Sequence, residues 1–183
     1  TNLNPKVRSS AIELFRMVDY RLAVDDAAIL IDTFEEEDPG LLMSAVRYLT
    51  DDPQADLEPK LLLLLESTDG AIIRAALKGL GVAGGKKSVE VLLEYLDDSD
   101  FDDNLKPEII LALGDLKDPS AIDPLLDILE DSGEDPTWRR YACASLGKIA
   151  DPSVLPNIKE ILFEEDAIMR SYAVGALRYF DSA

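Results

Sequence analysis

One pattern of apolar residues returns along this chain about every 33 residues, and this period constrains the fold more than any other feature. Six copies align on a reference position, called position zero, and successive copies lie 34, 31, 33, 33 and 31 residues apart. In each copy apolar residues stand at offsets −1, 4 and 7, and a small or apolar residue stands at offset 3. These offsets trace one face of an α-helix, and a repeat of this length predicts a stacked helical array. Position zero is occupied in turn by Arg8, Leu42, Ile73, Lys106, Arg139 and Arg170.

The repeating segments are predicted to be the second helices of helical pairs, and we call them B helices. A further apolar segment precedes every B helix except the first, and we call these segments A helices. The connectors carry Asp-Pro steps such as Asp135-Pro136, in which Asp suits a helix N-cap and Pro suits the first helical position. The predicted A helices cover residues 22–35, 54–66, 87–96, 120–130 and 153–164.

Glycines recur at fixed places in the B segments. Gly81, Gly114 and Gly147 all stand at offset 8, where we expect a left-handed cap or a tight turn that ends the helix. Gly79 and Gly175 lie inside predicted B helices, where glycine costs about 1 kcal/mol relative to alanine. For these two we expect close approach of a neighbouring helix.

Composition excludes several kinds of function. The 183 residues include no histidine, which removes the commonest general base and metal ligand. The single cysteine, Cys143, stands at an apolar offset and is predicted to be a core residue. No apolar stretch approaches the roughly 18 residues of a membrane span, and a formal charge of −19 opposes general binding to nucleic acid or anionic lipid. The paired carboxylates fall in turns and at helix ends, so we expect no catalytic site, no cofactor and no metal site.

Residues 118–180 carry a recognisable family pattern. It consists of Asp-Pro, then Pro-Leu, an apolar residue followed by Arg, and an Ala…Leu-Gly tail, and residues 118–150 show all of these while 151–180 repeat most of them. The stretch resembles the short HEAT-like repeat of the PBS (bilin) lyase type. The resemblance implies a right-handed α–α superhelix of about five helical pairs plus an N-terminal half repeat at residues 6–17, with the B helices lining the concave face. It indicates architecture much more strongly than function.

We expect residues 1–183 to form one HEAT-like domain. The first B segment has no A helix before it, and Phe180 ends the last B segment without a polar cap. Because solenoids need terminal caps, the chain is expected either to be a fragment of a longer array or to pair end to end with a second copy as a homodimer.

The cations are concentrated on the B segments, which carry 12 of the 18 lysines and arginines. Position zero is basic in four copies, and we expect these cations to pair with carboxylates of the preceding turn, such as Asp135 or Asp166. They are Arg8, Lys106, Arg139 and Arg170. Other cations and nearby tyrosines lie off the apolar stripe, where they form either a merely solvated surface or a binding surface, since Arg and Tyr are enriched at interfaces. These candidate partner-binding residues are Arg47, Arg74, Lys78, Arg140, Tyr141, Lys148, Tyr172 and Arg178.

Three functions remain open from the sequence. The first is a non-enzymatic scaffold or adaptor that binds an acidic or polar segment of a protein partner on the concave face. The second, implied by the resemblance alone, is a bilin lyase-like subunit or chaperone that binds a tetrapyrrole. The third, nucleic-acid binding, is opposed by the charge, so we expect no nucleic-acid partner and no membrane partner. We expect a cytoplasmic protein, and the start at Thr1 leaves open a leader or another domain outside this sequence.

Overall fold

The computed structural model describes residues 10, 40–41, 44 and 57–180. Contacts between residues divide the chain into two compact units, 1–84 and 85–183, and each is described by itself. The predicted helices at 6–17 and 22–35, and the candidate residue Arg47, lie outside the described residues.

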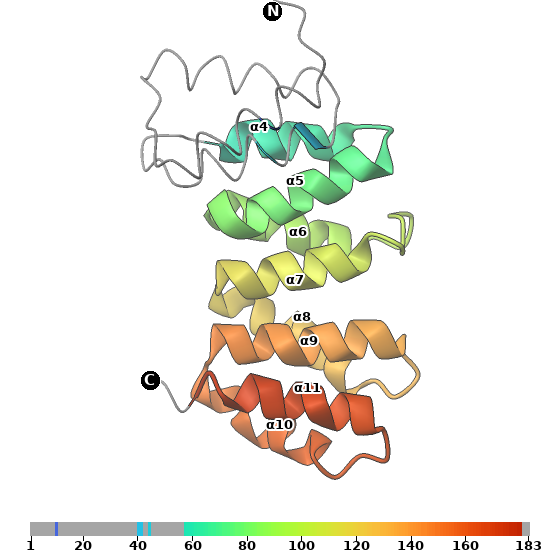
Figure 1. Cartoon of the computed structure of the whole chain (residues 1–183), viewed down its shortest axis with the longest axis vertical. Coiled ribbons are helices and arrows are strands. Elements are labelled where there is room, and N and C mark those ends of the chain that lie inside the picture. The colour runs from blue at the N-terminus through green and yellow to red at the C-terminus, as the bar shows by residue number, and fades with distance from the viewer. Residues whose placement is uncertain (1–9, 11–39, 42–43, 45–56, 181–183) are drawn as a thin grey trace, which may run out of the picture. The chain divides into compact units, whose positions relative to one another are not determined.

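In the first unit, residues 57–84 form one helical pair (Figure 1). The A helix is α4 (Glu58–Leu63), extended by the 3-10 turn η2 (Leu64–Glu66), and it packs against the B helix α5 (Gly70–Ala83). The side chains of Leu61 and Ile72 have no exposed area. Asp69 ends the connector and caps α5, since its Oδ1 accepts from the Ala71 amide at 2.8 Å.

In the second unit, three helical pairs follow one another (Figure 1). Each A helix lies close to the predicted range, and the second and third begin with a 3-10 turn at an Asp-Pro step. The A helices are α6 (Lys86–Asp97), η3 with α8 (Pro119–Ala121, Ile122–Glu130) and η4 with α10 (Pro152–Val154, Leu155–Ile161). The B helices are α7 (Lys106–Leu116), α9 (Pro136–Ile149) and α11 (Ala167–Leu177).

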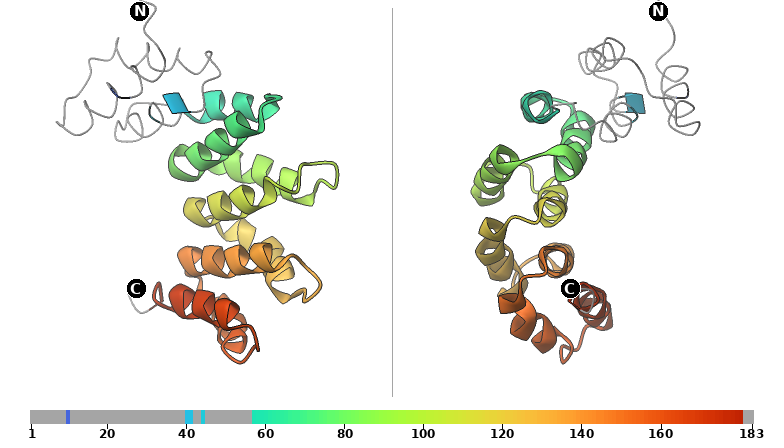
Figure 2. Two further views of the ribbon diagram at one scale, coloured as in Figure 1. Left: turned by 45° about the vertical axis from the view of Figure 1, so that its right-hand side comes forward. Right: turned by 90° about the vertical axis from the view of Figure 1, so that its left-hand side faces the viewer.

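The helices of the second unit form two layers. Helix α9 packs against its own A helix α8 and, on either side, against α7 and α11, whereas the A helices touch one another far less. In the right-hand view of Figure 2, α7, α9 and α11 lie on one side of this unit and α6, α8 and α10 on the other. The described residues contain only helices and turns, so the predicted all-α, HEAT-like fold of paired helices is confirmed.

The core follows the repeating apolar stripe. In α9 the side chains at offsets 3, 4 and 7, Ala142, Cys143 and Leu146, have no exposed area. The corresponding residues of α7 are equally buried, but in α11 Val174 at offset 4 remains 50% exposed. The register is therefore as predicted, and the exceptions, Val174 and the partly exposed Leu177 at offset 7, both lie on the last described B helix.

The glycine expectation at offset 8 was wrong. Gly114 and Gly147 lie inside α7 and α9, and the left-handed conformation occurs instead at Lys117 (φ 56°) and Ala150 (φ 58°), just after the helices end. The glycines are required by packing, because a Cβ on Gly147 would lie 2.6 Å from the Cα of Ala176 in α11. A Cβ on Gly114 would likewise lie 2.6 Å from the Cα of Ser145 in α9. Glycine at offset 8 thus lets consecutive B helices approach to backbone contact.

Gly175 was expected to allow such an approach, and it does not. A Cβ at Gly175 would meet nothing within 4 Å. In α11, moreover, offset 8 is occupied by the exposed Arg178 in place of glycine.

Candidate partner-binding surface

Three contacts between side chains join consecutive B helices. The Arg140 guanidinium of α9 lies 2.8 Å from the carboxylate of Asp166, the N-cap of α11. At the other end of α9 the Lys148 ammonium lies 2.6 Å from the Asp115 carboxylate of α7. Between α9 and α11, the rings of Tyr141 and Tyr172 lie with centroids 6.2 Å apart and planes tilted by 55°. This separation is within the range of favourable aromatic pairs.

The middle of this surface carries small side chains. Ala144 and Gly175 occupy offset 5 of α9 and α11, and on each helix this offset falls between the tyrosine at offset 2 and the residue at offset 9. Both are partly exposed, and the space beside the Gly175 α-carbon is open. We call this surface the B face and define it by Asp115, Arg140, Tyr141, Ala144, Lys148, Asp166, Tyr172 and Gly175.

Four of the eight candidate residues, Arg140, Tyr141, Lys148 and Tyr172, thus take part in contacts between B helices, and of these the structure brings Tyr141 and Tyr172 together. Arg178 is exposed at the C-cap of α11. Arg74 and Lys78 lie on α5 of the first unit, where Arg74 is half-buried and Lys78 is exposed. Arg140 and Lys148 each have a carboxylate partner one repeat away, a pairing that the sequence interpretation did not include.

Two of the position-zero cations, Arg139 and Arg170, hold neighbouring segments together, but through other partners than those expected. Arg139 forms a two-pronged ion pair with the Glu164 carboxylate (2.8 and 3.5 Å), and its Nε donates to the Leu129 carbonyl at 3.0 Å. Arg170 donates to the backbone carbonyls of Glu164 and Glu165. Asp135 and Asp166 instead cap α9 and α11, so the expected pairing of position zero with them was wrong.

For Lys106 the predicted pairing with a carboxylate of the preceding turn is confirmed. Its ammonium lies 3.0 Å from the Asp103 carboxylate and 5.1 Å from the centre of the Trp138 ring on the next repeat. This geometry is that of a cation–π contact.

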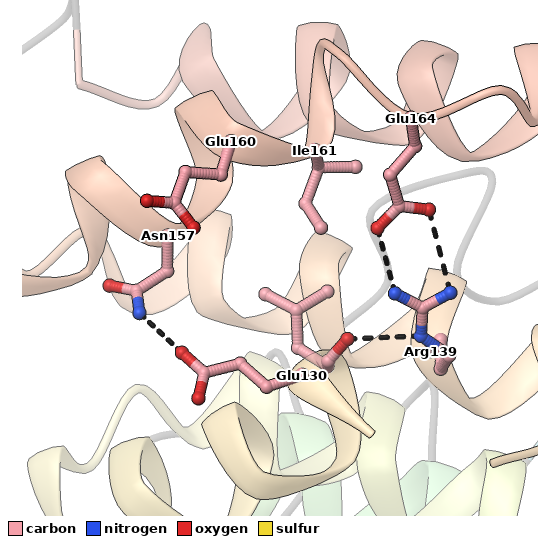
Figure 3. Close-up of a pocket in the computed structure, with 7 residues that line it drawn as sticks. Glu130, Arg139, Asn157, Glu160, Ile161 and Glu164 are labelled. Carbon is pink, nitrogen blue, oxygen red and sulfur yellow. Dashed lines mark hydrogen bonds and ion pairs between the residues drawn. The ribbon is translucent and has the colours of Figure 1, made fainter. Parts of the chain in front are cut away.

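Sequence reasoning missed one feature of the other layer, an open pocket of about 480 Å³ between α8, α10 and the first turn of α9 (Figure 3). Its walls include three glutamates, and an ion pair and an amide–carboxylate bond cross it. No single repeat contains the pocket, because the residues come from two consecutive repeats. The pocket is lined by Leu129, Glu130, Arg139, Asn157, Glu160, Ile161 and Glu164.

Hydrogen bonding or burial explains the shifted pKa values of three aspartates and of the Cys143 thiol. Hydrogen bonds from the Ser120 side chain and amide lower the pKa of Asp118, and the Thr137 amide lowers that of Asp135. Hydrogen bonding from Arg140, followed by that from the Ile168 amide, lowers the pKa of Asp166. Burial, assisted by the Glu164 carboxylate, raises the pKa of the Cys143 thiol to about 12. A thiol with so high a pKa is a poor nucleophile, which agrees with the predicted core role of Cys143.

Within the part of the chain that the structure describes, no three acidic or cysteine side chains converge to hold a metal ion. Among the same residues no helix has the length and apolar character needed to cross a bilayer.

Comparison with known proteins agrees with this architecture. A search of curated proteins found no match. Residues 57–136 match the family model described as HEAT repeats, which covers the helical pairs from α4 through α8 and the start of α9. The match does not distinguish the bilin-lyase subtype from other HEAT repeats. The match covers residues 57–136, and the same succession of paired helices continues through residue 180.

Proposed function

We propose that this chain is a non-enzymatic protein-interaction scaffold, and that a polar or acidic segment of a partner protein binds across the B face. The observation that carries the proposal is the row of polar and aromatic side chains across α7, α9 and α11, arranged around Ala144 and Gly175. HEAT repeats generally mediate protein–protein interactions, which supports the class of function.

The packing of the second unit supports the B layer as the inner side of the stack. Consecutive B helices approach to backbone contact at Gly114 and Gly147, while the A helices touch one another little. Elements that are closer together on one side of a stack make that side concave. A concave surface offers a bound segment contacts with several repeats at once.

The chemistry of the B face favours a segment rich in hydrogen-bonding groups. Tyr141 and Tyr172 combine a flat apolar ring with a polar hydroxyl, and such side chains dominate the energetics of many interfaces. Arg140 and Lys148 are both cationic and partly exposed, with 23% and 25% of the side chain accessible. Acidic groups of the partner would compete for these cations with Asp166 and Asp115. Arg47, Arg74, Lys78 and Arg178 remain predicted partner-binding residues.

Two variants of the B face test the proposal. Gly175→Gln adds a side chain where the space is open, so we expect a folded protein whose B face is obstructed. Tyr141→Ala combined with Tyr172→Ala removes the aromatic pair. Affinity capture followed by quantitative mass spectrometry identifies proteins retained by the unchanged chain, and titration then gives the affinity of each variant for the retained partner.

We expect both variants to weaken binding at least tenfold, while the control Asp123→Asn with Asp127→Asn, on the exposed side of α8, leaves it nearly unchanged. Equal affinity of the B-face variants and the unchanged chain would exclude the B face as the binding surface. The charge reversals Arg74→Glu and Arg140→Glu extend the test to the predicted cationic positions.

A further inference from the structure

The pocket of the A layer is separate from the B face and has a different chemical character. Its residues come from the end of α8, from the first turn of α9 and from α10 with the turn that follows, so it opens between neighbouring A helices. The volume, about 480 Å³, lies within the range of ligand-binding pockets.

The one cation of this pocket is already engaged. The Arg139 guanidinium binds both oxygens of Glu164, and its Nε donates to a backbone carbonyl (Figure 3). Glu164 thereby balances the charge of Arg139, and all three guanidinium nitrogens donate to acceptors of the protein itself. The geometry does not favour an anionic occupant.

Two further carboxylates lie on the opposite wall. Glu130 accepts from the Asn157 amide at 2.5 Å, and Glu160 lies beside this pair (Figure 3). Both glutamates are exposed, and within residues 57–180 no lysine or arginine pairs with either one. The Asn157 bond positions Glu130 without neutralising it, so this wall carries two uncompensated negative charges.

The two apolar lining residues contribute little accessible surface, since Leu129 has no exposed area and Ile161 has 6%. The exposed lining therefore belongs mainly to polar side chains, which match the charged end of a lysine or arginine. Next to Glu164 in sequence, Phe163 is 88% exposed, and an aromatic ring is a further contact for a cation.

We infer that this pocket binds a lysine or arginine side chain from a basic segment of a partner protein. The occupant follows from charge complementarity: two carboxylates without a cationic partner within residues 57–180 face an open cavity, on a chain whose formal charge is −19. Lys159, exposed on α10 and next to Glu160 in sequence, does not line the pocket. The inference goes beyond the proposed function, because it concerns the other helical layer and a partner segment of opposite charge.

The test uses the full chain and a fluorescein-labelled dodecapeptide of alternating arginine and serine, measured by fluorescence anisotropy at about 0.15 M salt, where the Debye length is about 8 Å. The pocket variant is Glu130→Gln with Glu160→Gln. The matched control, Asp123→Asn with Asp127→Asn, removes the same number of charges from the exposed side of α8. We expect the pocket variant to bind on the order of tenfold more weakly and the control to differ from the unchanged chain by less than about threefold.

Equal weakening by the two variants, or no binding by the unchanged chain, would overturn the inference, since either shows that the pocket has no special affinity for the cation. If the double variant fails to fold, Glu160→Gln alone serves, because this side chain is exposed. Gly175→Gln is expected to bind the peptide normally, so failure of the B-face proposal remains distinguishable.

A second measurement locates the occupant. The side-chain amide of Asn157 gives a separate nuclear magnetic resonance signal, and we expect the arginine–serine peptide to shift it. Calcium chloride at matched ionic strength, and the corresponding glutamate–serine peptide, are expected to leave it unshifted. A shift of equal size with calcium would assign the pocket to inorganic cations and overturn the inference of a side-chain occupant.

Discussion

The contact between consecutive B helices at offset 8 can be tested with two substitutions of the same chemistry. Gly147→Ala places a Cβ 2.6 Å from both the Cα and the Cβ of Ala176, whereas Gly175→Ala places one in open space. Carbon atoms in contact ordinarily lie about 3.5–4.0 Å apart, so α9 and α11 must separate by roughly 1 Å to accept the first methyl group. No side-chain rotation relieves the contact, because the Cα of Ala176 belongs to the backbone.

The balance between helix propensity and overpacking decides whether each variant raises or lowers the free energy of unfolding. Replacing a helical glycine by alanine gains about 1 kcal/mol of helix propensity. Overpacking a tight contact costs about 1–3 kcal/mol, and the required backbone shift favours the upper part of this range. We therefore expect Gly147→Ala to lower the free energy of unfolding by about 1–2 kcal/mol and Gly175→Ala to raise it by about 0.5–1 kcal/mol.

Urea unfolding provides the measurement. Trp138 is the single tryptophan and lies in α9, so its fluorescence reports on the affected unit, while far-UV circular dichroism reports on all helices. Midpoints compared at constant denaturant dependence give the difference in the free energy of unfolding. If Gly147→Ala proves as stable as Gly175→Ala, the close packing of the B helices is not what requires glycine, and the reasoning fails.

Three further predictions concern the core, the thiol and the caps. Ala142→Glu and Ala173→Glu each bury an unpaired charge where no side-chain area is exposed, so both are expected to lower the melting temperature severely, and unchanged melting would refute the register. The buried Cys143 thiol, with its pKa raised to about 12, should react with iodoacetamide at pH 8 only after denaturant is added, and rapid labelling of the native protein would contradict this burial. Because hydrogen bonds lower the folded-state pKa of Asp135 below 3.8, its contribution to stability is present above that pH and is lost as the pH falls through the lowered value. Asp135→Asn keeps the capping acceptor and should weaken this acid dependence in urea unfolding at several pH values, whereas Asp135→Ala should lower stability at neutral pH by about 1 kcal/mol.

Most of the helical architecture was predictable, because it depends on local patterns. The apolar offsets located α5, α7, α9 and α11, and the Asp-Pro steps located three caps, since both signals act within a few residues. The role of Gly114 and Gly147 was not predictable from their own helices. Glycine near a helix end commonly adopts a left-handed cap, and only the position of the next repeat reveals the packing contact.

The candidate surface was predicted in part for the same reason. Offsets along a helix predict that Arg140, Tyr141 and Lys148 lie off the apolar stripe, and in the structure each contacts a residue of a neighbouring repeat. Their partners Asp115 and Asp166 lie on neighbouring repeats, and the length of the intervening connectors decides which carboxylate comes within reach. The pocket between α8 and α10 depends even more on this spacing, because each wall comes from a different repeat.

The glycine contacts and the ion pairs of the B layer differ in how they respond to force. The close backbone contacts at Gly114 and Gly147 resist separation of the helices, and salt does not weaken them. The partly exposed ion pairs Arg140–Asp166 and Lys148–Asp115 also join the helices, but salt screens their attraction. The resistance of the layer formed by α7, α9 and α11 to bending should therefore fall as ionic strength rises, while the distance between these helices stays constant. A bound segment that competes for the ion pairs would then change the curvature of this unit without separating its repeats.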